Sequence, residues 1–496
     1  MRGRHGLPAV QLHSGDATAH NSRHGFAVRT SVANMKFQFL RSTRETLARN
    51  GHRIRIARAF VGRVFEDPLR FVVLGYAFYL ILGWFALTLP FCRTGAPASW
   101  LDLLFTATSA VSTTGLTTVS TADTYTWAGE TVILLLIQLG GLGYMTIGSF
   151  TVLSLTGKLP PLRERVGSVA LSLPAGFQIA AFLRVVVLFT LAIEAAGAGA
   201  LYPVFVAHGA PNPVWQSVFH SVSAFCTAGF GLFNDSFESF RGDAWLNTVI
   251  IALSYLGAIG FIVVSDLWSF VRGRKAWLTL TSKIILLSTL VISVAGTVLF
   301  FLDEPSIAGL PAGELWMTAL FQVMTASTTV GFNTVPIGAL SASSLFLLTV
   351  VMIIGASPSG TGGGLKTTSI TALWAVMMSV VRRRNQVTFL HREIPDVRVR
   401  AAAANVLFYF LTLSVGIYAL ALVESAPLAD QMFECASALG TVGLSRGITP
   451  SLTDWGKLII IALMFLGRVG PLALGMALVS KSYPAEDKGL KEDVAI

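Results

Sequence analysis

The sequence has few charged residues. Asp, Glu, Lys and Arg make up 12% of its 496 residues, about half of the roughly 25% that is usual in soluble domains. Hydrophobic residues reach 53%, a balance that excludes a soluble globular protein. The 33 Phe and 10 Trp exclude a disordered chain, because they need apolar partners. Cysteine is scarce too, and three residues cannot form a disulfide framework.

Basic charge is concentrated in one segment. The net charge of +10 would suggest a nucleic-acid partner if it were spread over a folded core. Residues 1–70 hold 13 Lys/Arg and 4 Asp/Glu, which leaves 23 and 22 for the remainder of the chain. The N-terminal segment therefore forms a basic tail, suited to anionic lipid or a cytosolic partner, and no nucleic acid is expected to bind. This tail has no apolar run long enough for a signal sequence.

Motifs of catalysis and nucleotide binding are missing. The sequence has no HExxH, no GxSxG and no Walker pattern, and no GxGxxG follows a strand. The ionisable residues Glu194, Lys366 and Arg468, which lie within apolar stretches, form no recognisable acid–base pair. We therefore expect neither an enzyme nor a bound cofactor.

Long apolar runs are abundant. A membrane core about 30 Å thick needs roughly 20 apolar helical residues, and eight stretches meet this length: Phe71–Leu89, Thr131–Leu155, Phe182–Phe205, Trp245–Trp268, Ile284–Leu302, Leu345–Val380 with a break, Ala403–Val423 and Lys457–Ser480. Between the members of each pair lies a segment of only about 10–14 apolar residues, too short to cross. The fold class predicted is an all-α membrane protein with eight transmembrane helices.

The distribution of Lys and Arg predicts the orientation. The side that holds both termini and the loops connecting the pairs carries 30 of the 36 Lys/Arg. Positive residues stay on the cytoplasmic side, so both termini are expected in the cytoplasm of a multi-pass plasma-membrane protein, in bacteria the inner membrane. The opposite side carries about half of the acids, which are expected to concentrate cations.

A motif repeats four times after the short segments. Its pattern is [Ser/Thr]-Ala-x-x-Thr-x-Gly-[Leu/Phe], and its copies are Ser109–Leu116, Ser223–Phe230, Thr325–Phe332 and Ser437–Leu444. The copies are nearly evenly spaced along the chain. A second glycine pattern follows each copy at a similar interval, in the segments Gly140–Gly143, Gly257–Gly260, Gly355–Pro358 and Gly467–Gly470. The chain is thus predicted to contain four units of span, short helix, loop and span.

Such a unit suits a cation pathway. Non-helical backbone at membrane depth is tolerated where it is buried in protein or lines a wet cavity, and rings of backbone carbonyls replace the hydration shell of a monovalent cation. The short helices would direct their partially negative C-terminal ends toward the axis. Alternatively, the glycines only permit close helix packing. For the second glycine pattern, close packing and a pore are equally good explanations.

With these motifs the sequence resembles the Trk/Ktr/HKT superfamily of potassium transporters, most closely the bacterial KtrB/TrkH membrane subunit. The resemblance covers about Phe71 to Ser480. It implies four repeats around a pseudo-fourfold pore, at 71–156, 182–271, 283–381 and 401–480, flanked by cytoplasmic tails at 1–70 and 481–496. We refer to these ranges as repeats 1 to 4. It also implies K⁺ uptake as the ion-translocating subunit, a homodimer, a cytosolic nucleotide-binding regulatory subunit of the KtrA/TrkA kind and possible activation by Na⁺.

The resemblance also implies site residues. Backbone carbonyls of a selectivity filter would bind K⁺ at Thr113, Thr114, Gly115, Thr227, Ala228, Gly229, Thr329, Val330, Gly331, Thr441, Val442 and Gly443. Because all four copies have glycine, the resemblance implies selectivity for potassium. An intramembrane gate would comprise Gly355, Ser357, Pro358, Ser359, Gly360, Thr361, Gly362, Gly363, Gly364, Lys366 and Arg468.

The residues themselves also favour a break and a charge in the pathway. Five Gly and one Pro between Gly355 and Gly364 cannot continue a stable helix, although a kinked helix is the alternative. Arg468 is too far from either end of its span to reach the interface easily, and Lys366 is either a cytoplasmic anchor or a gate contact. Glu194 is expected to form an intramembrane hydrogen bond. Asn234 and Asn333 either shape the outer mouth or are solvated loop residues.

Two other transport functions stay open. The first is a sodium-permeable or non-selective cation channel, which relative permeabilities would distinguish. The second is a secondary transporter with a midplane site between inverted repeats, although the four repeats here all run in the same direction.

Overall fold

The computed structural model describes residues 68–143, 146, 149, 153, 179–273 and 276–479. The expected C-terminal tail, 481–496, and all but the last three residues of the expected N-terminal tail, 1–70, lie outside the described residues.

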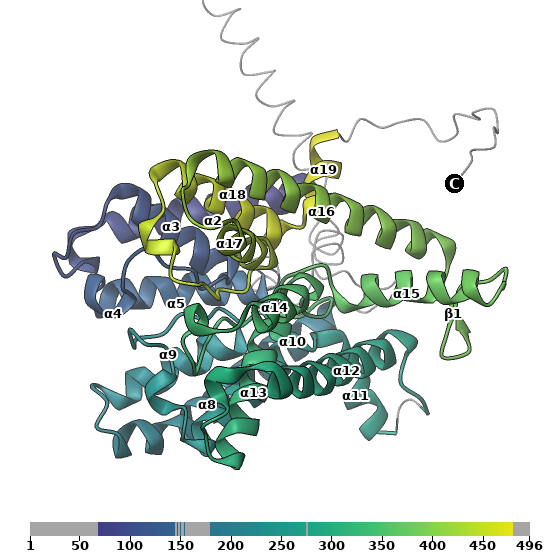
Figure 1. Ribbon diagram of the computed structural model, residues 1–496, viewed down its shortest axis with the longest axis horizontal. Coiled ribbons are helices and arrows are strands. Elements are labelled where there is room, and N and C mark those ends of the chain that lie inside the picture. Colours follow the sequence, from purple (N-terminus) through teal and green to yellow (C-terminus); the bar gives the residue numbers. More distant parts are fainter. Residues whose placement is uncertain are drawn as a thin grey trace, which may run out of the picture. The chain divides into compact units, whose positions relative to one another are not determined.

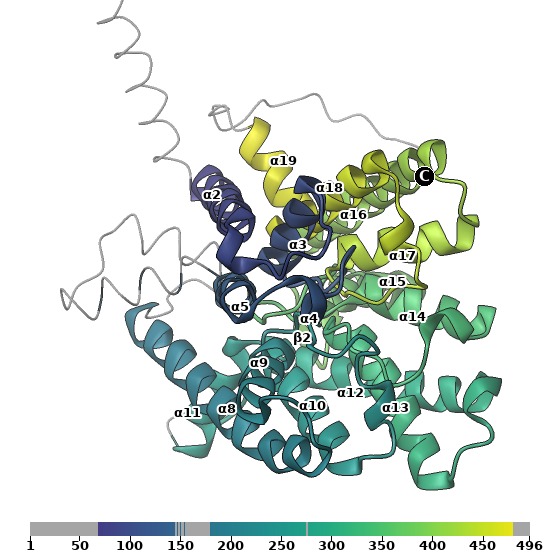
Figure 2. The ribbon, with the colours of Figure 1, turned by 90° about the vertical axis from the view of Figure 1, so that its left-hand side faces the viewer.

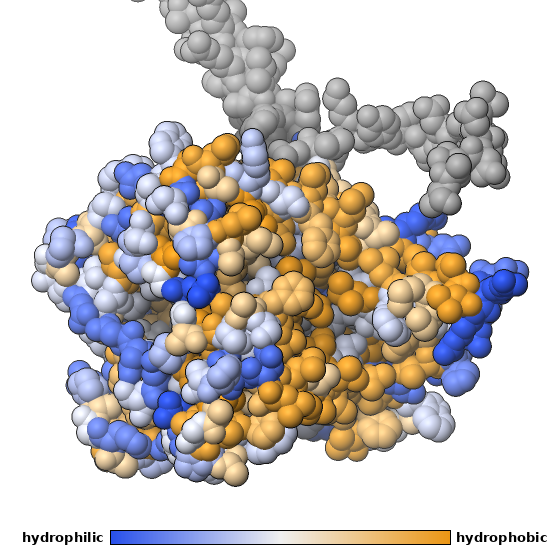
Figure 3. All heavy atoms as spheres, viewed as in Figure 1, coloured by the Kyte–Doolittle hydropathy of each residue, from blue (hydrophilic) through white to orange (hydrophobic). Residues whose placement is uncertain are grey.

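Each repeat begins with a long apolar helix. These helices are α2 (Pro68–Thr88), α8 (Ile179–Ala207), α12 (Leu280–Asp303) and α16 (Asp396–Val423). Each is long and apolar enough to cross a membrane, and less than half of each is buried within the protein. The remaining apolar side chains need lipid as their solvent. Figure 3 shows apolar residues over the middle of one face, with hydrophilic residues at the end near α4 and at the opposite end near β1.

A short helix follows in each repeat, and its C-terminal half is buried. These helices are α3 (Trp100–Ser112), α9 (Pro213–Phe225), α13 (Ala312–Thr328) and α17 (Leu428–Gly440). Three of them have 13 residues and span about 20 Å at 1.5 Å per residue, which is too short for the membrane core, whereas α13 has 17 residues. The start of α3 is fixed by a capping box between Ser99 and Asp102. Proline stands at the first position of α9 and just before α13 and α17, where it needs no N–H partner.

The second span of each repeat is interrupted. Its helices are α5 (Trp127–Leu142) in repeat 1, α10 (Ala244–Ala258) with α11 (Phe261–Val271) in repeat 2, α14 (Ala342–Ile354) with α15 (Thr367–Val381) in repeat 3, and α18 (Asp454–Val469) with α19 (Pro471–Val479) in repeat 4. The expectation of uninterrupted spans at Thr131–Leu155, Trp245–Trp268 and Lys457–Ser480 is wrong, since breaks follow Leu142, Ala258 and Val469, and α10 and α11 meet at 94°. Among the described residues, four helices could each cross a membrane alone, or five spans if α10 and α11 count together.

Glycines at two positions near these breaks have different roles. Gly143, Gly260, Gly355 and Gly470 end a helix or separate two, with φ of 77°, 94°, 68° and 90°, values that glycine adopts at little cost. A Cβ on Gly140, Gly257 or Gly467 would instead overlap a backbone carbonyl of the preceding short helix. Close packing therefore requires the first glycine of each pair, and the positive φ at the break favours the second. Gly355 takes the position of the second glycine, so the sequence register that aligned it with Gly140 is corrected.

The four repeats follow one another around a centre (Figure 2). Repeat 1 contacts repeat 2 through α5 and α9, repeat 2 contacts repeat 3 through α10 and α13, and repeat 3 contacts repeat 4 through α14 and α17. Contact between α18 and α3 joins repeat 4 to repeat 1. The ribbon also shows the small elements, among them the hairpin between α15 and α16 (Figure 1). They are α4 (Thr121–Thr124), η1 (Pro90–Cys92), η2 (Glu238–Phe240), η3 (Pro305–Ile307), η4 (Ile337–Ala339), η5 (Thr449–Ser451), β1 (Thr388–Phe389) and β2 (Arg392–Glu393).

Candidate functional site

Each short helix leads into a loop segment with the same unusual backbone. Thr113, Thr227, Thr329 and Thr441 have φ of 53°, 51°, 60° and 50°. A β-branched residue rarely adopts positive φ, so the same strain at four equivalent positions indicates a constraint of function rather than of local sequence. We call Thr113–Gly115, Thr227–Gly229, Thr329–Gly331 and Thr441–Gly443 the filter segments.

The glycines of the filter segments form a closed ring. A Cβ on Gly115 would lie 2.6 Å from the carbonyl oxygen of Ala228, and a Cβ on Gly229 would overlap that of Val330 in the same way. The series continues from Gly331 to the carbonyl of Val442 and from Gly443 back to that of Thr114. Each filter segment thus lies against the next in one rotational direction. The ring leaves no room for a side chain at any of the four glycines.

Hydrogen bonds within each repeat fix the filter segments to their helices. The N–H groups of Thr114, Ala228, Val330 and Val442 donate to the carbonyls of the first residue of the motif, at 2.8 to 3.1 Å. In repeats 1 and 4 the hydroxyls of Ser109 and Ser437 also accept the N–H of Gly115 and Gly443, each at 3.0 Å. The sequence motif contained these serines, but their role was not predicted. Among the described residues, no hydrogen bond is accepted by a backbone carbonyl of the filter segments.

The Gly355–Lys366 loop packs directly against the filter segments of all four repeats. Thr361 is buried and accepts a hydrogen bond from the Thr227 hydroxyl at 3.1 Å, while its own hydroxyl donates to the Phe225 carbonyl at 3.1 Å. The N–H of Gly363 donates to the Thr329 hydroxyl at 2.9 Å, and a Cβ on Gly363 would overlap the Thr441 hydroxyl. The loop is not a kinked helix, since its backbone is irregular from Gly355 to Lys366.

Arg468 joins this loop to repeat 1. Its guanidinium donates to the Thr113 hydroxyl at 2.9 Å, to the Gly141 carbonyl at 3.2 Å, and to the carbonyls of Thr361 and Gly140. The Thr113 hydroxyl also lies 3.5 Å from the Thr361 carbonyl. Among the described residues, no carboxylate forms an ion pair with Arg468. The positive charge is therefore held by neutral carbonyl and hydroxyl oxygens beside the filter segments.

Lys366 forms hydrogen bonds within the Gly355–Lys366 loop. Its ammonium group donates to the carbonyls of Gly362 and Gly363, at 2.5 and 3.3 Å. Of the two roles that the sequence left open, the structure supports a contact within the loop. A cavity of about 680 Å³ adjoins the loop, with Ser359, Gly360, Lys366 and Arg468 among its lining residues.

Glu194 in α8 has two side-chain partners. Gln138 of α5 donates to its carboxyl group at 3.0 Å, and the thiol of Cys226 lies 3.6 Å from it. The prediction of an intramembrane hydrogen bond is confirmed. Because Cys226 directly precedes Thr227, this cluster lies behind the filter segment of repeat 2.

Polar side chains on the other side of the filter segments join neighbouring repeats. Asn234 of repeat 2 donates to Asp123 of repeat 1 at 2.9 Å, and Asn333 of repeat 3 donates to Glu238 of repeat 2 at 2.7 Å. Both asparagines therefore have structural partners. The hydrogen bonds from Asn234 and Ser120 lower the pKa of the exposed Asp123 carboxyl, which stays ionised at neutral pH.

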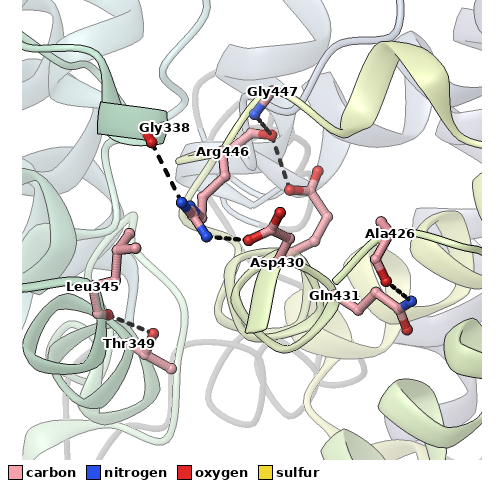
Figure 4. Close-up of polar contacts among 10 residues, drawn as sticks. Gly338, Leu345, Thr349, Ala426, Asp430, Gln431, Arg446 and Gly447 are labelled. Atoms are coloured by element: carbon pink, nitrogen blue, oxygen red, sulfur yellow. Dashed lines mark hydrogen bonds and ion pairs between the residues drawn. The ribbon is translucent and has the colours of Figure 1, made fainter. Parts of the chain in front are cut away.

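Arg446 of repeat 4 makes the corresponding connection to repeat 3. Figure 4 shows its guanidinium between the carbonyl of Gly338, at 3.3 Å, and the carboxylate of Asp430. Lys457 of repeat 4 pairs with Asp102 of repeat 1 at 2.8 Å. All four boundaries between repeats thus carry a polar connection.

Comparison with known proteins places this geometry in a family. Residues 84–484 match the TrkH family, described as cation transport protein. The Ktr system potassium uptake protein B of Bacillus subtilis is 36% identical over 82% of this chain and 91% of its own length, and the potassium/sodium uptake protein NtpJ of Enterococcus hirae is 35% identical over 85% and 94%. The crystal structure of the potassium transporter TrkH from Vibrio parahaemolyticus shares the fold, with a TM-score of 0.66, 21% identity and coverage of 84% of this chain and 85% of that one. The chain belongs to the TrkH family of cation transport proteins and is a multi-pass membrane protein.

Proposed function

We propose that this chain is the ion-translocating subunit of a Ktr/Trk-type potassium uptake system, with the four filter segments as its selectivity filter. The observation that carries the proposal is the closed ring, in which each glycine of the filter segments lies against the carbonyl that precedes the next one. Such a ring presents backbone oxygens to an ion on the axis, and carbonyl oxygens replace the hydration shell of K⁺.

The surroundings of the ring favour a cation. Four short helices end at the filter segments, so the partial negative charge of each C-terminus lies beside the pathway. The filter segments contain no carboxylate, and carbonyl dipoles therefore have to provide the selectivity. Potassium is named for both relatives and sodium for NtpJ alone. A sodium-permeable pathway is therefore the second candidate.

The Gly355–Lys366 loop is proposed as the gate. It contacts filter segments of all four repeats and is held by Arg468, so a hydrated ion leaving the ring meets it before the adjoining cavity. To move, the loop would have to break its hydrogen bonds to α9, α10 and α11 as well as those to the filter segments.

Partners and location are part of the proposal. A relative named as protein B of a Ktr system supports assembly with other Ktr components, for which we propose a homodimer of this chain and a nucleotide-binding cytosolic subunit. The excess of Lys and Arg on one side supports insertion in the plasma membrane with both termini in the cytoplasm. Activation by Na⁺ is proposed from the resemblance alone.

A pair of glycine variants tests the ring. In Gly443→Ala the added methyl group overlaps the Thr114 carbonyl, whereas Gly447→Ala, four residues later, has similar φ (+95° and +93°) but nothing within 4 Å. Both variants carry the same backbone strain, so only the first disturbs the ring. We would measure growth of a potassium-uptake-deficient bacterium on limiting potassium, with the chain expressed together with a Ktr-type regulatory subunit and its membrane level determined by immunoblot.

We expect the wild type and Gly447→Ala to restore growth and Gly443→Ala to fail at equal membrane levels. Equal rescue by both variants would refute the filter assignment. If wild-type protein that reaches the membrane never restores growth, the potassium function itself is wrong, and sodium flux or saturable exchange by a secondary transporter becomes the next measurement.

A further inference from the structure

One position in the short helices is polar and buried in all four repeats. It lies three residues before the motif and is occupied by Thr106, His220, Gln322 and Glu434. The exposed fractions of these side chains are 1%, 0%, 0% and 0%. Burial of a polar side chain is costly unless it is hydrogen-bonded, so four such residues at one position of a pseudo-fourfold structure require an explanation.

In three repeats this side chain forms a hydrogen bond to the residues that directly follow the filter segment. In repeat 2, Nε2 of His220 accepts the backbone N–H of Leu232 at 3.2 Å, and Nδ1 lies 2.8 Å from the carbonyl of Gln216. Because an amide N–H can only donate, Nε2 is the acceptor and the proton is on Nδ1. His220 is thus a neutral imidazole that links two backbone segments.

Repeats 3 and 4 make the equivalent connection with different chemistry. In repeat 3 the amide of Gln322 donates to the Thr334 hydroxyl at 3.1 Å. In repeat 4 the carboxyl group of Glu434 accepts the Ser445 hydroxyl at 2.9 Å and also the Thr449 hydroxyl. These bonds span 12, 12 and 11 residues of sequence in repeats 2, 3 and 4.

Repeat 1 is the exception. The hydroxyl of Thr106 interacts with that of Tyr125, and among the described residues it makes no hydrogen bond to the residues that directly follow Gly115. The hydroxyl of Thr118, three residues beyond that glycine, interacts instead with the carboxylate of Asp102 in the first turn of α3.

We propose that His220, Gln322 and Glu434 are positioning residues for ion selectivity, which fix the outer end of each filter segment from behind. This inference rests on the proposed potassium pathway and adds residues that contact no ion. The middle residue of each filter segment is already held by its N–H bond to the first residue of the motif. In repeats 2, 3 and 4 the positioning residue holds the chain beyond the glycine, so the carbonyls between the two ties keep their spacing. Without the outer tie the ring can adapt to the smaller Na⁺.

The test compares polar and apolar residues of similar shape. The variants are Glu434→Leu, Gln322→Leu, the conservative Glu434→Gln, whose carbonyl oxygen still accepts a hydroxyl, and the matched control Thr106→Val in repeat 1. Full-length protein with its regulatory subunit is reconstituted in proteoliposomes, and the permeability to Na⁺ relative to K⁺ is measured from reversal potentials. A ratio of permeabilities does not depend on how much protein folds.

We expect each Leu variant to raise relative Na⁺ permeability about fivefold, the equivalent of one net hydrogen bond. Glu434→Gln and Thr106→Val should stay close to the wild type. If Glu434→Leu does not assemble, the pair Ser445→Ala and Thr449→Val removes the same bonds from the other end and should give the same increase.

Two outcomes would overturn the inference: an unchanged ratio in conducting Leu variants, or an equal increase in Thr106→Val, which would mean that any change in a short helix relaxes the ring. Failure of the wild type to conduct K⁺ would instead refute the proposed function.

Discussion

Replacement of Arg468 by methionine should open the pathway. The side chain is of similar length but carries no charge and donates no hydrogen bond. Of the four groups that accept from Arg468, Thr113, Gly140 and Gly141 belong to repeat 1, and only the Thr361 carbonyl belongs to the Gly355–Lys366 loop. If Arg468 keeps its position when the loop moves away, its bond to the Thr361 carbonyl exists only in the closed state. The variant therefore destabilises the closed state relative to the open state.

The size of the effect follows from that one bond. A hydrogen bond to a charged group contributes about 1.5–3 kcal/mol, which corresponds to a ratio of closed to open states lower by about 10- to 150-fold. The loss of the other three bonds weakens both states equally. Removal of the positive charge beside the filter segments also lowers the barrier for a cation, so both effects act in the same direction.

The assay is K⁺ efflux from proteoliposomes that contain the chain without a regulatory subunit. Arg468→Lys separates the two effects, since it keeps the charge but loses the planar fork of donors, and it should give a smaller increase than Arg468→Met. The control is Lys457→Met, in the same helix, which breaks the ion pair with Asp102 far from the loop. Efflux from Arg468→Met that is no faster than from the wild type and the control would refute the reasoning.

Three further changes have expected outcomes. Gly257→Ala should lower the thermal unfolding temperature, because its methyl group overlaps the Phe225 carbonyl and overpacking costs about 1–3 kcal/mol, whereas Gly199→Ala, inside α8 with nothing within 4 Å, should raise stability by about 0.5–1 kcal/mol; equal shifts in thermal melts would contradict this account. Thr361→Val keeps the shape of the side chain but loses its bond to the Phe225 carbonyl, while the Thr227 hydroxyl, which donates to Thr361, still has the Cys226 carbonyl as acceptor; basal K⁺ efflux should therefore rise about fivefold for one net bond, and slower efflux would count against the loop as gate. Burial alone would raise the pKa of Glu304, but N–H donors from Ser306 and Ser341 lower it. Its contribution to stability is therefore complete above the unfolded pKa of about 4.3 and is lost as the pH falls through the folded pKa. Glu304→Gln should melt below the wild type at pH 7, and this difference should shrink in acid; a difference independent of pH would show that the carboxylate charge is irrelevant.

The sequence was most informative where the backbone conformation strongly favours one residue type. Glycine adopts positive φ at the least cost, and the glycine of each filter segment has positive φ beside a threonine strained into the same region. Four copies of one motif therefore predicted the filter segments and the family. The membership is confirmed by the matching relatives, while the roles of the single residues remain predictions.

Other features depend on tertiary contacts that hydropathy does not encode. The breaks at Gly260 and Gly470 lie within stretches that are apolar on both sides, so composition predicted continuous spans. The register of Gly355 could not be resolved, because its repeat has no packing glycine three residues earlier, where Met352 stands. The polar residues at the position of His220 were missed since each repeat uses a different side chain there.

The ring of repeats also has an order of assembly. Three of its boundaries join repeats that are consecutive in the chain, but the boundary between repeats 4 and 1 is closed by Lys457 with Asp102 and by Arg468 with Thr113, each pair 355 residues apart. Contacts of such sequence separation form late, because a long loop must first be closed, and repeat 4 is also the last to be synthesised. Until then the ring has one open side, and in the proposed function the chain would hold no ion on its axis before repeat 4 is inserted. Arg468 bonds both to Thr113 of repeat 1 and to the Thr361 carbonyl of the Gly355–Lys366 loop, so it would complete the ring and hold the proposed gate in the same step, and a newly made protein would not leak.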